Sequence, residues 1–242
     1  MFRTLAAAAL CTATAMPVLA QDTMDDVEFG ERVRDYLLEN PEVIMEAVGI
    51  LQMRDEAAAQ EADEALVAAH SEALTNDGFS WVGGNPDGDI TVVEFMDYRC
   101  GYCKKAFPEV ENLLSADGNI RFIVKEFPIL GDQSVLASQF AIATQIVAGD
   151  AAYKAVHDTL MSFNGEITAD SLRQVADSLD LDGAAILARL DDPEVIRRIT
   201  ANRELGQALN ISGTPTFVVE DLMVRGYVPE DQLQALIDDL RG

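Results

Sequence analysis

Two cysteines, Cys100 and Cys103, stand three positions apart and are the residues best suited to chemistry. A β-prone run that includes Val92, Val93 and Phe95 precedes them, and apolar residues at helical spacing follow them as far as Leu114. We therefore predict that the pair opens a helix directly after a strand. The N–H groups and the dipole of a first helical turn stabilise a thiolate. Cys100 is thus expected to be acidic, and Cys103, one turn further in, to be the resolving thiol.

Three basic residues, Arg99, Lys104 and Lys105, surround the pair. The chain has 17 Lys and Arg against 42 Asp and Glu, so three bases this close together depart from the general balance. We expect their charges to favour the Cys100 thiolate further. The composition of this stretch therefore indicates a redox-active pair.

Other uses of a cysteine pair fit this sequence less well. A zinc site needs four ligands, and the other candidates, His70 and His157, are isolated. A c-type haem attachment needs a histidine directly after the second cysteine, where this chain has Lys104. A structural disulfide remains an alternative, although so short a loop removes little entropy from the unfolded chain. We expect neither a metal nor an organic cofactor, because the two sulfurs carry the electrons.

Length and charge limit the class of protein. The 242 residues suffice for one or two domains with a real core. The net charge of −25 argues against nucleic acid or an anionic membrane as a partner, and its simplest meaning is solubility.

The first twenty residues have the marks of a secretory signal. Arg3 precedes an Ala-rich apolar run that is too short to span a membrane, and small residues end it before a cleavage site after Ala20. The signal predicts export to the periplasm, and Cys11 lies in the discarded peptide. An exported chain left with a single close Cys pair suits a catalyst of disulfide exchange better than a stapled protein.

Residues 21–75 are expected to form a helical arm, broken once at Asn40-Pro41. From Asp55 onward its apolar stripe consists mainly of alanine, which buries little area in a monomer. Three arrangements are open: an exposed stalk, packing against copies of itself in a homo-oligomer, or a helix lying on its own domain. We favour self-association through 21–75.

A second domain is expected over residues 79–242, with a boundary at Asn76-Asp77-Gly78. It begins with a turn at 83–88, and strands at 90–95 and 120–127 flank the cysteine helix as a parallel β-α-β unit. A purely helical insertion occupies 131–209, and a hairpin and a closing helix end the chain. Pro215 stands at the entry of the first hairpin strand, where a cis peptide bond after Thr214 would turn the chain and free backbone groups for a substrate.

These residues resemble the thioredoxin superfamily, and within it the DsbA-like thiol-disulfide oxidoreductases. The likeness covers about 79–242 and depends on Cys100-Gly-Tyr-Cys103 followed, after the insertion, by Gly213-Thr-Pro-Thr-Phe217. It implies an α/β thioredoxin fold with a helical insertion, here preceded by a helical extension. It also implies that Cys100 attacks and Cys103 resolves as a redox disulfide, and that Pro215 is cis and faces the pair. Thr214, Pro215 and Tyr102 are then the expected substrate-binding residues.

Glu94 stands six residues before Cys100, where DsbA-like proteins carry a buried acid beneath the active site. Such a carboxyl would relay a proton to or from Cys103, which makes Glu94 a third catalytic candidate. The alternative is a strand-edge glutamate that faces solvent.

The dipeptide Gly101-Tyr102 differs from the Pro-His of the best-known DsbA-like oxidase. It is similar to the pair in periplasmic disulfide isomerases and in the suppressor-of-copper-sensitivity ScsC group, whose members are oligomers joined through N-terminal extensions. We therefore expect a disulfide isomerase or reductase that acts on protein thiols and disulfides and needs a membrane thiol-disulfide electron partner. A DsbA-like dithiol oxidase is the first alternative. A copper(I)-binding protein or a chaperone that uses the same pair or arm is the second.

Overall fold

The structure, a computed structural model, describes residues 25–242 in two compact units, one extending to Arg54 and one from Asp55 to Gly242. The predicted signal peptide, its cleavage site after Ala20 and Cys11 lie outside the described residues. No helix in residues 25–242 combines the length and the apolar character that crossing a membrane requires.

The first unit consists of helix α1 (Asp26–Glu39) and the first part of helix α2 (Glu42–Ala69). Asp25 caps α1, because its Oδ1 accepts hydrogen bonds from the N–H groups of Val27 and Glu28 at 3.0 and 2.8 Å. The helix ends at Asn40, which confirms the predicted break. None of the residues of α1 is buried.

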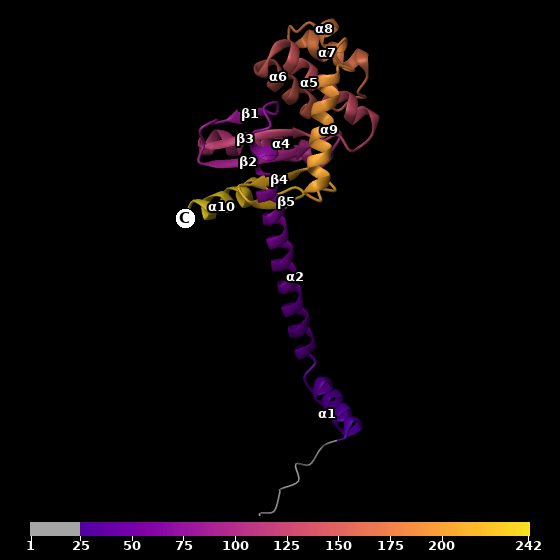
Figure 1. Cartoon of the computed structure of the whole chain (residues 1–242), viewed down its shortest axis with the longest axis vertical. Helices are drawn as coiled ribbons and strands as arrows, with labels where there is room; N and C mark the ends of the chain where they lie inside the picture. Colours follow the sequence, from indigo (N-terminus) through magenta and orange to yellow (C-terminus); the bar gives the residue numbers. More distant parts are fainter. Residues whose placement is uncertain (1–24) are drawn as a thin grey trace, which may run out of the picture. The chain divides into compact units, whose positions relative to one another are not determined.

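The second unit is built on a five-stranded sheet with the order β1-β3-β2-β4-β5 (Figure 1). Strands β2 and β3 are parallel and are joined by helix α4 (Gly101–Asp117), so the predicted β-α-β unit is confirmed. The other neighbouring pairs are antiparallel, including the predicted hairpin of β4 and β5. The strands are β1 (Trp81–Gly84), β2 (Ile90–Met96), β3 (Ile120–Glu126), β4 (Thr216–Val219) and β5 (Leu222–Arg225).

Strand β1 is an addition to the predicted fold, which had only a turn at 83–88. It pairs with β3, with Trp81 opposite Val124. Its last residue, Gly84, has φ +62°, and a Cβ there would lie 2.3 Å from the Ile120 carbonyl oxygen. Only glycine fits this close approach. Because glycine has no side chain and is rare in strands, the sequence pattern did not indicate a strand here.

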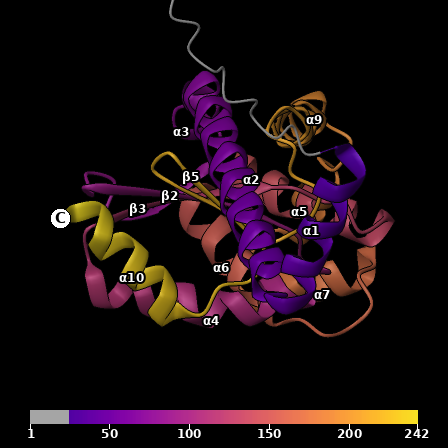
Figure 2. The same ribbon diagram turned by 90° about the horizontal axis from the view of Figure 1, so that it is seen from below.

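Residues 131–209 form helices only, as predicted. Within them α5 and α6 pack on each other, as do α7 and α8, and α9 returns the chain to the sheet. The closing helix α10 contacts α4, beside which it lies in Figure 2. The helices are α5 (Asp132–Ala148), α6 (Asp150–Ser162), α7 (Ala169–Ser178), α8 (Gly183–Leu187), α9 (Pro193–Ala208) and α10 (Glu230–Arg241).

Each face of the sheet has its own apolar core. The face that includes Val92 and Met96 packs against α4 and the insertion. The opposite face includes Val93 and Phe95, and it is covered by the end of α9, by Val67 of α2 and by Leu74 of the short helix α3 (Ser71–Thr75). Burying a side chain of this size stabilises the fold by about 1.5–3 kcal/mol.

The last part of the predicted arm therefore belongs to the second unit, which begins before the expected boundary at Asn76. A buried ion pair strengthens this attachment. The Lys125 ammonium on β3 donates to the Asp77 carboxylate at 2.6 Å and to the Ala73 carbonyl oxygen at 2.8 Å. Residues 55–62 of α2 are exposed, whereas from Asp63, which pairs with Arg225, the helix lies on its own domain as in the third arrangement.

Candidate active site

The two cysteines lie at the predicted strand-to-helix junction. Cys100 is the N-cap of α4 and Cys103 is in its first turn. The Cys100 side chain is 7% exposed, whereas Cys103 is fully buried, and both are free thiols. Of the two cysteines, only Cys100 retains any solvent exposure.

Hydrogen bonds make Cys100 the acidic thiol. Its pKa is lowered to about 5, first by a hydrogen bond from Cys103 and further by the backbone N–H groups of Cys103 and Tyr102, and burial opposes this only in part. Cys100 is therefore a thiolate at neutral pH. This confirms the expected acidity, although the Cys103 thiol contributes more to it than the N–H groups of the first helical turn.

The three bases near the pair do not act as the sequence suggested. Lys104 donates to the Phe163 carbonyl oxygen, and Arg99 Nη1 lies 3.4 Å from the Gly165 carbonyl oxygen. The Lys105 ammonium lies 3.9 Å from the ring centroid of Tyr227. The charged ends bind other groups, and the neighbouring thiol and N–H groups account for the shift of the Cys100 pKa instead.

Cys103 is the opposite kind of thiol. Burial raises its pKa far above the ordinary value, and the hydrogen bond to Cys100 and the charge of Glu94 raise it further. Cys103 therefore stays protonated while Cys100 is a thiolate. It becomes a nucleophile only if a nearby group takes its proton.

Glu94, on β2, is a buried carboxyl whose charge acts on Cys103 and which is a candidate to accept its proton. It is 3% exposed, and its Oε1 has no hydrogen-bond partner. Burial raises its pKa to about 8, and the charge on Cys100 contributes to the rise. The structure thus confirms the predicted buried acid and excludes the solvent-facing alternative.

The segment between α9 and β4 faces the cysteines from the other side. The Thr214–Pro215 peptide bond is cis, as predicted, and the Thr214 carbonyl oxygen lies 3.1 Å from the Cys100 sulfur. Thr216 Oγ1 donates to the Gly213 carbonyl oxygen at 2.9 Å, and the N–H of Gly226 donates to the Pro215 carbonyl oxygen at 2.9 Å. The fold therefore brings Cys100 and Thr214 together from positions 114 residues apart.

An exposed aromatic pair adjoins the cysteines. Tyr102, which is 63% exposed, stacks on Tyr227 with ring centroids 6.3 Å apart. The hydroxyl of Tyr227 donates to Glu109 Oε1 at 2.6 Å. Tyr227 was missed in the sequence, where it carries no signal beyond its position after the hairpin. Together the exposed Tyr102 and the half-buried Tyr227 form an aromatic pair beside the cysteine helix.

A second missed residue is Asp97, which fixes the segment before Cys100. Its buried carboxylate accepts from the N–H groups of Arg99 at 2.7 Å, Ile129 at 2.8 Å and Leu130 at 3.0 Å. Its own carbonyl oxygen accepts from the N–H of Cys100 at 3.0 Å. Asp97 thus ties the cysteine segment to the loop after β3.

An acidic thiol at a helix N-terminus, a buried thiol behind it and a cis-proline segment opposite define a thiol-disulfide exchange site on a thioredoxin-like fold. Residues 91–238 match the model of the DSBA-like thioredoxin domain. The chain belongs to this DsbA-like family of thiol-disulfide oxidoreductases. Residues 25–58 match a second model, the copper resistance protein ScsC N-terminal domain.

Solved structures agree with both matches. A thioredoxin-like oxidoreductase from Silicibacter pomeroyi DSS-3 is 40% identical, with 70% of this chain and 96% of that chain covered and a TM-score of 0.66. BcfH from Salmonella enterica Typhimurium is 30% identical, with 89% and 96% covered and a TM-score of 0.74. Proteus mirabilis ScsC in a compact conformation is 29% identical, with 90% and 98% covered and a TM-score of 0.66.

Among curated proteins the first relatives are much longer than the match. The Na(+)/H(+) antiporter NhaA 1 of Salinispora arenicola is 32% identical over 156 residues, which are 64% of this chain and 24% of the antiporter. The chain thus spans about a quarter of the length of these relatives. Disulfide bond formation protein D of Bacillus subtilis is 24% identical, with 66% of this chain and 76% of that protein covered.

Proposed function

We propose that this chain is a periplasmic thiol-disulfide oxidoreductase that isomerises or reduces protein disulfides through Cys100 and Cys103. The observation that carries the proposal is the difference in pKa and burial between the two sulfurs. Cys100, which retains slight solvent exposure, has a pKa of about 5 and is a thiolate, whereas Cys103 is a fully buried thiol. A periplasmic thioredoxin-like protein from Salmonella enterica, 29% identical, supports the compartment.

The reaction begins when the Cys100 thiolate attacks one sulfur of a client disulfide. A mixed disulfide forms and the other client sulfur leaves as a thiolate. In isomerisation a client thiolate attacks the client sulfur that is bound to Cys100. A new client disulfide forms and the Cys100 thiolate is released, so neither protein gains or loses electrons. An extended client backbone next to Thr214 would be held by hydrogen bonds to this segment.

Reduction follows when no client thiol resolves the intermediate. Glu94 in its ionised form accepts the Cys103 proton, and the Cys103 sulfur then attacks Cys100. The client leaves as a dithiol and a Cys100–Cys103 disulfide remains. Returning this disulfide to the dithiol consumes two electrons, so a membrane protein with a reducing dithiol is the proposed partner.

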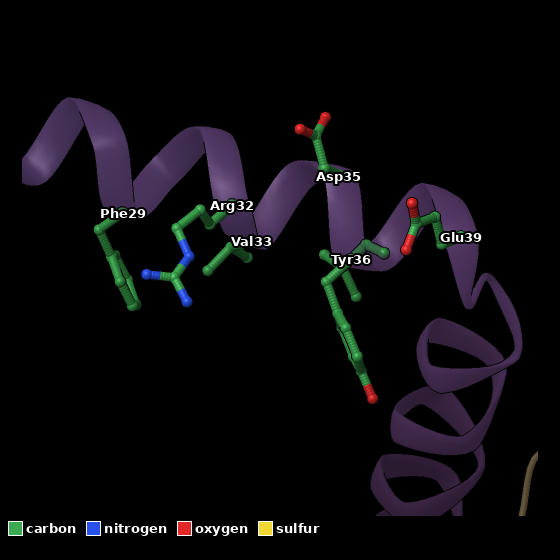
Figure 3. A pocket seen from close by; sticks show the side chains of 7 residues that line it. Phe29, Arg32, Val33, Asp35, Tyr36 and Glu39 are labelled. Carbon is green, nitrogen blue, oxygen red and sulfur yellow. The ribbon is translucent and has the colours of Figure 1, made fainter.

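We further propose that the chain is a homo-oligomer joined through its first unit. Phe29, Val33 and Tyr36 of α1 point to one side of the helix in Figure 3 and line a shallow hollow, to whose rim Asp35 also contributes. Their side chains are exposed at the spacing of one helical face. An apolar face of this kind is stabilised when copies of the arm pack against one another.

The test is reactivation of a scrambled multi-disulfide protein by the full mature chain. The wild type is expected to reactivate the substrate, and Cys100→Ser to abolish this. The double change Val33→Asp and Tyr36→Asp should lower the molecular mass in solution to that of a monomer and remove the isomerase activity. Glu31→Lys, an exposed change that helical spacing places opposite this face and that does not line the hollow, is the matched control and should change neither.

Two results would contradict the proposal. Rapid oxidation of dithiols by the wild type without any reactivation would indicate a DsbA-like oxidase. An unchanged mass after the double change would show that the apolar side of α1 does not join the subunits.

A further inference from the structure

A buried carboxylate, Glu126, lies at the end of β3 on the side of the sheet that faces the helical insertion, and the exchange reaction as described above does not use it. It is 3% exposed, and it forms no salt bridge with another of the described residues 25–242. Its Oε1 accepts from the hydroxyls of Tyr98 and Tyr153, each at 2.7 Å, and its Oε2 from Ser138 at 2.7 Å. Burial raises the pKa of Glu126 to about 7, against the lowering effect of these three donors.

The three donors come from separate parts of the second unit. Ser138 is on α5 and Tyr153 is on α6, so both belong to the helical insertion. Tyr98 belongs to the short segment between β2 and the cysteines. Its hydroxyl also lies 3.1 Å from Nδ1 of His157 on α6, and the two rings meet edge to face. Glu126 is thus one of the points at which the insertion is connected to the cysteine segment, beside the contacts of Arg99 and Lys104 described above.

Tyr98 precedes Cys100 by two positions, with only Arg99 between them. The N–H of Cys100 donates to Asp97, directly before Tyr98, and Asp97 is bound in turn to the loop after β3. The side chain of Tyr98 is fully buried, so it cannot move without the backbone of this segment. The distances from the Cys100 sulfur to Thr214 and to Cys103 therefore depend on where Tyr98 is held.

We propose that Glu126 is a positioning residue for thiol exchange: by binding Tyr98 it holds Asp97–Cys100 so that the Cys100 sulfur stays next to Thr214 and Cys103. The proposal depends on the exchange function proposed above for Cys100. In this proposal the helical insertion also helps to position the cysteine segment, because α5 and α6 supply the other donors to the Glu126 carboxylate.

Two tyrosines allow a matched test in the full chain. Tyr98→Phe and Tyr153→Phe each remove one hydroxyl donor from the same oxygen of Glu126, and both side chains are fully buried. Only Tyr98 adjoins the cysteines. We expect Tyr98→Phe to change the equilibrium constant with glutathione by about twofold to tenfold, the range of one hydrogen bond, and to shift the pH midpoint of the Cys100 thiolate absorbance. Tyr153→Phe should change neither, although urea unfolding shows a similar loss of stability in both variants.

Glu126→Gln should shift the same two quantities in the same direction as Tyr98→Phe. If Glu126→Gln does not fold, the comparison of Tyr98→Phe with Tyr153→Phe is sufficient to test the positioning role. Equal values for Tyr98→Phe and the wild type, or equal shifts for the two tyrosine variants, would overturn the positioning role. A wild type that does not exchange with glutathione at all would instead overturn the proposed function, so the two failures are distinguishable.

Discussion

Replacing Glu94 by glutamine is predicted to stabilise the reduced protein, and to do so only above about pH 5. The Glu94 pKa is raised from 4.5 to about 8, mainly by burial. Below pH 4.5 the carboxyl is protonated in both the folded and the unfolded chain and has no effect. As the pH rises towards 8 the unfolded chain loses this proton while the folded chain keeps it, so stability falls.

The size of the effect follows from the gap between the two pKa values. Each pH unit in this range corresponds to about 1.4 kcal/mol, so the penalty is about 3 kcal/mol at pH 7 and about 5 kcal/mol above pH 8. Glutamine has nearly the same volume and no charge, so Glu94→Gln escapes the penalty. The Cys100 thiolate is present in both proteins, so its own contribution largely cancels in the comparison.

The measurement is urea unfolding of the reduced wild type and of Glu94→Gln across about pH 4 to pH 8. The free energies of unfolding should coincide at the acid end and diverge as the pH rises, with the variant the more stable. Glu56→Gln, an exposed change on α2, is the control and should follow the wild type throughout. A difference that stays constant with pH, or a variant less stable at pH 7, would refute the inference of a buried, largely protonated carboxyl.

Three further predictions concern the neighbouring groups. The alkylation rate of Cys100 should rise with pH through a midpoint near 5, with Cys103 unmodified by mass spectrometry; a midpoint above 8 would contradict the described hydrogen bonds. Asp77→Asn should lower the free energy of unfolding by about 3 kcal/mol in urea, because it leaves the Lys125 ammonium buried without its carboxylate, and the alkylation profile should not change. Tyr227→Ala should raise the KM for a disulfide-containing peptide about threefold through lost stacking, with kcat unchanged; an equal loss in kcat would show that the ring acts on the chemical step instead.

Much of the catalytic unit could be predicted because its patterns are local. A β-prone run marks β2, and helical spacing after Cys100 marks α4. The acidity of Cys100 follows from its place at a helix N-terminus, which the same local pattern fixes. The burial of Glu94 could be expected from its apolar neighbours in the strand.

The features that escaped prediction depend on contacts between distant parts of the chain. Lys125 and Glu126 are adjacent charged residues that suggest an exposed strand end, yet both are buried, on opposite faces of the sheet, with partners from other elements. Tyr227 meets Tyr102 only in the folded chain. The bases around the cysteines were misjudged because the sequence gives their positions and not their partners, which are two carbonyl groups for Arg99 and Lys104 and the Tyr227 ring for Lys105.

The two family matches leave the residues between 58 and 91 unassigned, and in the structure these residues belong to the second unit. Val67 and Leu74 lie in the core of the second unit, and Asp77 neutralises its buried lysine. The junction at which arms could be exchanged between relatives by recombination therefore lies near Arg54, inside α2, rather than at the turn before β1. A chimera joined near Arg54 keeps Val67 and Leu74 on this face of the sheet, whereas one joined at the turn would remove both and leave that part of the core exposed beside the end of α9.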